Sequence, residues 1–207
     1  MFWCCARDDA AVTLALDNAN ARPTVPVALS DELVLRLNSD ELKRLDLDLS
    51  DPKCIILASC DGAAADWNQR SPNQIFPFDR IVKIDGKQCE SQDFLDILSR
   101  DKGSLVELSV ERPLKHLLYL KKPGRLGLDL MFTKVDAKPW RASVKPWIAS
   151  ISNDGLVAEW NASMPELAIS EHDRIISINS KAGSPGELVD VLSAAEVIEM
   201  EVLHYNF

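Results

Sequence analysis

The sequence lacks any apolar run long enough to cross a bilayer, and it has little glycine and little histidine. A transmembrane helix needs about 20 consecutive apolar residues, a length that no segment approaches. Among the eight glycines, residues 124–127 come nearest to a glycine-rich loop, but the Lys-Ser/Thr of a phosphate-binding loop does not follow. The three histidines pair with no nucleophile, and the cysteine spacing is unlike that of zinc sites. We therefore expect no catalysis, no metal and no cofactor.

The composition is that of a folded protein with an acidic surface. Of its 207 residues, 46% are hydrophobic and 27% are charged, and the formal net charge is −9. A negative surface repels phosphate backbones, so we expect no nucleic acid partner. The length suits two small domains, and nothing in the sequence indicates an oligomeric state.

The N-terminal residues 1–28 form a separate region in which Pro23 and Pro26 argue against regular structure, so we expect partial disorder there. No basic start precedes the short apolar stretch, so the pattern is not that of a secretory signal. Five cysteines without such a signal indicate reduced thiols in the cytoplasm. Cys4 and Cys5 are candidates for S-acylation, which would hold the protein at the cytoplasmic face of a membrane; the alternative is two unmodified thiols.

An internal repeat organises the rest of the chain. Four blocks recur in the same order, and each copy contains an apolar strand followed by Gly and then Trp-Asn. The matched blocks are residues 35–37 with 118–120, 44–49 with 125–130, 55–68 with 148–161, and 79–86 with 173–180. The repeat predicts two homologous domains, at 29–113 and 114–207.

Each copy has the same predicted elements, which are mainly strands with short helices, an α+β pattern. Alternating apolar residues predict strands, and the continuous apolar run of residues 53–59 predicts a strand buried on both faces. In the first copy we expect strands at 33–37, 45–49, 53–59, 80–84 and 105–111, with helices at 63–68 and 91–100. In the second copy we expect strands at 116–120, 126–132, 147–152, 174–178 and 197–204, with helices at 156–161 and 187–192.

This order of elements resembles the PDZ domain, as do two motifs. Gly124-Arg125-Leu126-Gly127-Leu128 is similar to the carboxylate-binding loop of that family. Residues 173–179 and 79–86 are similar to its Gly-Asp-x-Ile-x-x-Val-Asn-Gly segment. The resemblance covers residues 33–112 and 115–205 and implies two partly open β-barrels or sandwiches in tandem. It also implies a non-catalytic scaffold or adaptor that binds protein C-termini or extended peptides by strand addition.

The resemblance implies a peptide-binding groove in the second domain. Backbone N–H groups of the loop would bind a terminal carboxylate, and the following strand would pair with the peptide while a helix forms the opposite wall. The residues implied are Arg125, Leu126, Gly127, Leu128, Leu130, Pro185, Val189 and Leu192. Because Pro185 cannot donate the side-chain hydrogen bond that many PDZ domains offer at this position, we expect apolar peptide side chains there.

The first domain departs from the family pattern at the same loop. Asp46 replaces the loop glycine, and Asp48 adds a second negative charge near an incoming carboxylate. Either an internal segment binds there or nothing does. The residues implied for this weaker groove are Leu45, Leu47, Ser91, Leu95 and Leu98. For both copies the alternative is a vestigial groove that serves only as scaffold.

An insertion at residues 131–146 gives an alternative function. Basic and aromatic side chains in this segment could contact acidic lipid headgroups in a peripheral membrane interaction. The residues concerned are Lys138, Trp140, Arg141 and Lys145. The other interpretations are a solvated loop or, for the chain as a whole, a regulatory module for an enzyme on another chain.

Overall fold

Two antiparallel sheets, one from each copy of the repeat, form the framework of the computed structural model, which describes residues 33–98, 104–133 and 144–207. The first sheet has the strand order β1-β6-β4-β3-β2 with β5 beside β4, and the second has the order β7-β11-β10-β9-β8. When the strands are matched through the repeat, the two orders are the same. We call residues 33–111 the first module and residues 114–207 the second module.

The first module contains three helices besides its sheet. Its elements are β1 (Leu33–Asn38), α1 (Ser39–Leu42), β2 (Leu47–Asp51), β3 (Cys54–Leu57), α2 (Ala63–Arg70), β4 (Arg80–Ile84), β5 (Lys87–Gln88), α3 (Ser91–Leu98) and β6 (Leu105–Glu111). The sequence reading did not predict α1, although Asn38 and Glu41 form a capping box that is visible in the sequence.

The second module repeats this plan, but its described residues contain no counterpart of α1 or of the short strand β5, and it has an additional short helix, η2. Its elements are β7 (Leu114–Lys121), β8 (Leu128–Met131), β9 (Trp147–Ile151), α4 (Leu156–Ser163), η2 (Pro165–Leu167), β10 (Arg174–Ile178), α5 (Pro185–Ala194) and β11 (Val197–His204). In α5, Ser184 and Glu187 form a capping box and Pro185 occupies the first turn, where its missing N–H has no cost. The predicted fold class, mainly β with short helices in two PDZ-like modules, is confirmed. Within the described residues, however, neither sheet closes into a barrel.

The repeated Trp-Asn pair has the same structural role in both modules. In each, the Asn side chain donates to and accepts from the backbone of one isoleucine, Ile75 for Asn68 and Ile169 for Asn161, at 2.8–3.0 Å. The preceding Trp packs against the core and donates its indole N–H to a carbonyl of the same loop. The pair therefore fastens the loop after α2 or α4 to its helix, which explains its recurrence.

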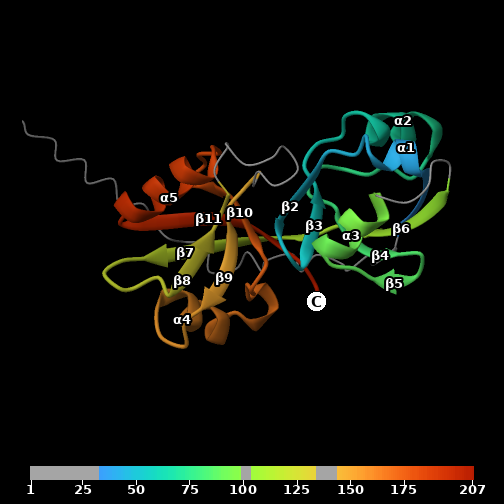
Figure 1. Cartoon of the computed structure of the whole chain (residues 1–207). Helices are drawn as coiled ribbons and strands as arrows, with labels where there is room; N and C mark the ends of the chain where they lie inside the picture. Colours follow the sequence, from blue (N-terminus) through green and yellow to red (C-terminus); the bar gives the residue numbers. More distant parts are fainter. Residues whose placement is uncertain (1–32, 99–103, 134–143) are drawn as a thin grey trace, which may run out of the picture.

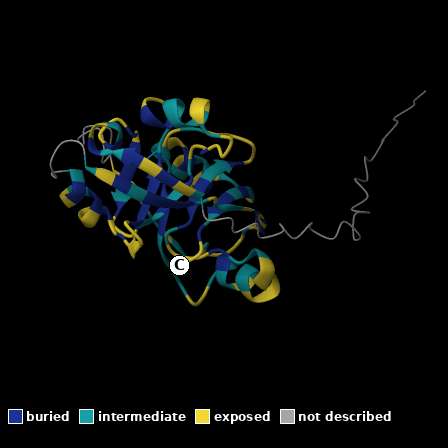
Figure 2. Cartoon of the chain, turned by 90° about the vertical axis from the view of Figure 1, so that its right-hand side faces the viewer, coloured by how far each residue is buried: buried dark blue, intermediate teal, exposed yellow. Residues whose placement is uncertain are grey.

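Each module has its own apolar core, and a third buried cluster joins the two. Figure 2 shows buried residues along the strands and exposed residues on the outer sides of the helices. The third cluster contains Cys54 and Ile56 of β3 and, from the second module, Leu203 and Tyr205. Burial raises the pKa of the Cys54 thiol to about 12, so this thiol stays protonated and acts as an apolar group. Figure 1 shows β2 and β3 next to the second module.

Buried ionic groups cross the same junction. Arg174 and Asp48 are both 0% exposed, and the Nη1 of Arg174 lies 2.8 Å from the Oδ2 of Asp48. His172 Nδ1 lies 2.9 Å from the Oδ2 of Asp51, which is also fully buried. The sequence reading placed the Asp48 charge near the first groove, but the carboxylate is instead paired with an arginine of the other module. The polar positions of β2 therefore serve the junction.

Candidate functional site

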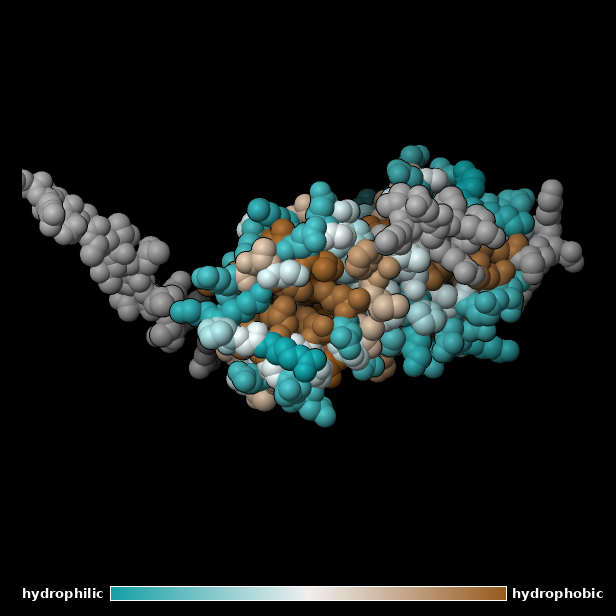
Figure 3. All heavy atoms as spheres, turned by 60° about the vertical axis from the view of Figure 1, so that its left-hand side comes forward, coloured by the Kyte–Doolittle hydropathy of each residue, from teal (hydrophilic) through white to brown (hydrophobic). Residues whose placement is uncertain are grey.

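The second module has a groove between the edge strand β8 and helix α5. On one side β8 pairs with β9, and among the described residues no strand occupies its other side. The groove has a volume of about 460 Å³ and is lined by residues of β8, of α5 and of the loop that precedes β8. Figure 3 shows a hollowed apolar surface on this module, with hydrophilic residues around it. We call this feature the β8–α5 groove.

The loop before β8 presents backbone N–H groups at one end of the groove. Among the described residues, the N–H groups of Leu126 and Gly127 donate to no acceptor, whereas the loop carbonyls are held by Ser152, Leu156 and Val157. Since the Ser152 N–H donates to the Gly127 carbonyl, Leu128 and Ile151 form a non-hydrogen-bonded pair. The N–H and C=O of Leu128 consequently point away from β9. In the described part of the chain, the unpaired N–H groups of Leu126 and Gly127 therefore lie directly next to the unpaired edge of β8.

The conformation of the loop depends on Gly127. Its φ is +76°, and a Cβ at this position would lie 2.6 Å from the carbonyl oxygen of Asp154. No other residue type fits this close approach without a backbone shift. In the first module the equivalent residue, Asp46, is not among those with positive φ, so the same arrangement of donors does not form there.

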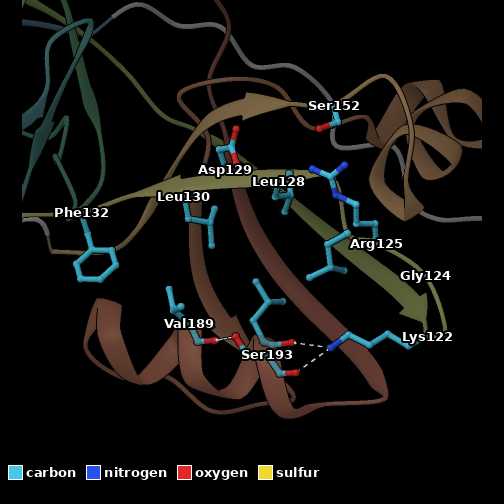
Figure 4. Close-up of a pocket in the computed structure, with 13 residues that line it drawn as sticks. Lys122, Gly124, Arg125, Leu128, Asp129, Leu130, Phe132, Ser152, Val189 and Ser193 are labelled. Atoms are coloured by element: carbon cyan, nitrogen blue, oxygen red, sulfur yellow. Dashed lines mark hydrogen bonds between the residues drawn. The ribbon is translucent and has the colours of Figure 1, made fainter.

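Two basic residues stand at the loop end of the groove. Arg125 is exposed on the loop, and Lys122 directly follows β7. The ammonium of Lys122 donates to the carbonyls of Leu192 at 3.2 Å and of Ser193 at 2.9 Å, where α5 ends, as the dashed lines in Figure 4 show. A cation at a helix C-terminus is stabilised by the helix dipole. Both residues also favour an anionic ligand at this end.

The structure brings together seven of the eight residues that were implied for this groove, and it separates one. Pro185, in the first turn of α5, is not among the lining residues. The residues that do line the groove are Arg125, Leu126, Gly127, Leu128, Leu130, Val189 and Leu192. The predicted set lacked six further lining residues, which are Lys122, Gly124, Asp129, Phe132, Ser152 and Ser193. The basic pair at residues 121–122, directly before the loop, was the available signal for Lys122.

In the first module the corresponding space is filled by the protein itself. Leu45 and Leu47 are 9% and 5% exposed and belong to the core, and Leu95 and Leu98 pack against the same core. Ser91, which was implied to face a peptide, is buried and donates its hydroxyl to the Asp51 carbonyl at 2.7 Å.

Helix α1 adds a second obstruction in this module. It places the buried Leu42 in the core, and the Leu42 carbonyl accepts the N–H of Leu45, a donor that the loop would otherwise offer. The five residues implied for this groove therefore contribute to the core of the first module or hold its loops.

Predictions for five residues and for one segment lie outside the described residues. They concern Cys4 and Cys5 at the N-terminus together with residues 1–28, and Lys138, Trp140 and Arg141 of the insertion. Lys145 is described, and its ammonium donates to the Gly183 carbonyl at 2.6 Å. Burial lowers the pKa of Lys145. This lysine is therefore a partly buried structural contact.

The three histidines contact one another or buried aspartates. His116 and His204 stack 4.8 Å apart, His204 bonds to Asp173, and His172 bonds to Asp51. The described residues contain no helix long and apolar enough to cross a membrane. They also contain no group of three or more metal-ligating side chains.

The strand order, the short and long helices of each module, and the loop before β8 together define two PDZ-like modules in tandem. Two solved structures are similar to the chain. The structure of INAD PDZ45 in complex with NG2 peptide has 16% identity, covers 86% of this chain and 92% of its own, and gives a TM-score of 0.36. The complex of INAD PDZ45 and NORPA CC-PBM has 15% identity, covers 86% and 94%, and gives a TM-score of 0.37. No family model and no curated protein sequence matches the chain. At such low identities and TM-scores, the chain's own topology and loop geometry remain the basis for assigning the fold.

Proposed function

We propose that this protein is a non-catalytic scaffold whose second module binds the C-terminus of a partner protein in the β8–α5 groove. The observation that carries the proposal is that, among residues 33–98, 104–133 and 144–207, nothing pairs with the outer edge of β8 or accepts the adjacent N–H groups of Leu126 and Gly127. A peptide that pairs with this edge adds a strand to the sheet, and its terminal carboxylate meets the backbone donors and the two basic residues. An internal segment of a protein could also add a strand to β8, but it carries no terminal carboxylate to bind the donors at the loop end of the groove. These donors therefore favour a C-terminus as the ligand.

The walls of the groove favour apolar peptide side chains. Alternate residues of an extended peptide face the same side, so the last and the third-from-last side chains point into the groove. The walls offer Leu126, Leu128 and Leu130 from one side and Val189 and Leu192 from the other. We therefore propose apolar residues at both peptide positions.

The lipid-binding alternative has less support in the described residues. Its one described residue, Lys145, is partly buried and bonded to Gly183, so it is not available for a headgroup. We accordingly keep peptide capture as the proposed function. A cytoplasmic location and an acyl anchor at Cys4 and Cys5 remain predictions.

A C-terminal peptide library screened against the full chain tests the proposal. We expect binders with a Kd of about 1 μM, equivalent to about −8 kcal/mol. Val189→Lys places an ammonium group in the apolar groove and should weaken binding at least about tenfold because that charge loses its hydration. The matched control is Asp190→Lys on the exposed side of the same helix, which should bind as the wild type does. A folded wild-type chain that selects no peptide would overturn the proposed function.

A further inference from the structure

A short segment, Val144 to Pro146, lies between the first module and the walls of the β8–α5 groove. The N–H of Val144 donates to the Oδ2 of Asp48 in the first module at 2.9 Å. Arg174 Nη1 donates to the same oxygen at 2.8 Å and to the Lys145 carbonyl at 3.2 Å. The Pro146 carbonyl accepts the N–H of Ile175 at 3.1 Å. Asp48 therefore holds the segment both directly and through Arg174.

The same segment is bonded to the helical wall of the groove. The Lys145 ammonium donates to the Gly183 carbonyl, one residue before Ser184, the N-cap of α5. Gly183 itself lies close to the first turn of the helix, since a Cβ there would lie 2.9 Å from the Glu187 carboxylate. A displacement of Lys145 thus acts on the start of α5.

The segment also continues into the strand that holds the other wall. Trp147, the first residue of β9, is the register partner of Met131, the last residue of β8. Trp147 is buried and stacks on His172, with ring centroids 5.9 Å apart. Residues 144–146 are thus connected to α5 through Lys145 and to β8 through Trp147, so their position affects the spacing between the two walls of the groove.

We propose that Asp48 of the first module is a positioning residue for the peptide site of the second module, acting through residues 144–146. This inference rests on the proposed function. It gives the first module, whose own groove is filled, a role in setting the affinity of the neighbouring one. Asp48 does not line the groove, so its effect on a peptide is indirect.

Two variants break the connection at different points while keeping the fold. Lys145→Met removes the bond to Gly183 and keeps the aliphatic stem. The double variant Asp48→Leu/Arg174→Met removes both buried charges together, a replacement that buried ion pairs commonly tolerate. We expect each to bind the selected peptide about tenfold more weakly, within the usual range for coupling between sites. The matched control is Lys115→Met on the outer face of β7, where the exposed lysine pairs with Glu201 of the neighbouring strand.

Hydrogen exchange of the ligand-free chain supplies a readout that does not depend on the peptide. Amides of β8 and α5 should exchange faster in Lys145→Met than in Lys115→Met, because the walls of the groove lose a restraint. If Lys145→Met and Asp48→Leu/Arg174→Met both keep the peptide affinity and the exchange rates of the wild type, the inference is wrong. If the wild type binds no peptide, the proposed function fails. Unchanged exchange of β8 and α5 amides in Lys145→Met would separately refute the connection from residues 144–146 to the groove.

Discussion

At the scale of single residues, the least expected feature is the buried charge between the modules. Arg174 is fully buried, and in the described part of the chain its Nε and Nη2 atoms have no hydrogen-bond partner. Its pairing with Asp48 joins residues 126 positions apart, so no local pattern could have revealed it. The alternation of Leu and Asp correctly predicted β2 as a strand. It could not show which partner the aspartates face.

Removal of one partner of this pair should be strongly destabilising. Asp48→Ala leaves the Arg174 guanidinium buried without a counter-charge, and we expect a loss of about 3–5 kcal/mol in the free energy of unfolding. Urea denaturation measures this loss. The double variant Asp48→Leu/Arg174→Met should recover most of it, because it buries no charge. Equal stability of Asp48→Ala and the wild type would contradict the burial described here.

His116 makes the second module sensitive to acid. Burial and the neighbouring His204 lower the pKa of His116, and the Ala168 carbonyl and the more distant Asp173 oppose this effect. The unfolded chain takes up the proton at about pH 6.5, before the folded chain does. The stability that neutral His116 contributes is therefore present above that pH and is lost as the pH falls through it. His116→Asn keeps a donor for Ala168, and its unfolding midpoint should vary less with pH between 7 and 5. If the unfolding midpoints of the wild type and His116→Asn change equally with pH, His116 does not cause the acid sensitivity.

At the scale of elements, the repeat made most of the fold predictable, and the differences between the copies determine the site. The strands and most helices lie within a few residues of the predicted ranges, because period-two apolar patterns identify half-buried strands reliably. Helix α1 was missed because it is only four residues long. Its effect is large, since Leu42 and the bond from Leu45 close the loop that remains open in the second module.

Some of the residues that line the groove could be predicted from the sequence, and others could not. Those carried by the loop motif or by α5 positions, such as Gly127 and Val189, could be identified by resemblance to the family. For Lys122 the basic pair at residues 121–122 was a signal of charge near the loop, but its contact with the end of α5 was not predictable because it depends on how the segment after β7 turns. Phe132 lies just beyond β8, where the sequence does not indicate which way a side chain points.

The loop before β8 should tolerate no side chain at Gly127. An alanine there combines a positive φ with a Cβ 2.6 Å from the Asp154 carbonyl oxygen. Gly86→Ala is the matched control, because its φ is also +76° but nothing lies within 4 Å of the added Cβ. We expect about 1–2 kcal/mol for Gly86→Ala from backbone conformation alone, and a clearly larger loss for Gly127→Ala. Thermal unfolding compares the two, and equal losses would contradict the close approach.

At the scale of the whole molecule, the modules share a buried junction. The chain passes from β6 to β7 through Arg112 and Pro113 only. The last residues then pack on the first module: the Tyr205 hydroxyl donates to the Phe78 carbonyl at 3.1 Å, and the Phe207 ring lies under the Arg80 guanidinium at 3.7 Å. The repeat predicted two domains but not which residues pack at the junction, because the residues that pair there, such as Arg174 and Asp48, are far apart in the sequence.

This junction should make unfolding a shared event. Separation of the modules would expose Cys54, Ile56, Leu203 and Tyr205 and would leave Arg174 and Asp48 unpaired. We therefore expect one calorimetric transition for the wild-type chain, with a van't Hoff enthalpy equal to the calorimetric enthalpy. Asp48→Ala should lower the midpoint of the transition and broaden it. Two resolved transitions in the wild type would indicate that the junction couples the modules weakly.

The most direct test of the central claim compares one selected peptide in two forms, with a free terminal carboxylate and with a terminal amide. Isothermal titration with the full chain measures both affinities. If the N–H groups of Leu126 and Gly127 receive the carboxylate, amidation should weaken binding at least about tenfold, because an anion–donor interaction is replaced by a neutral one. Equal affinities for the two forms would contradict recognition of a chain terminus in this groove.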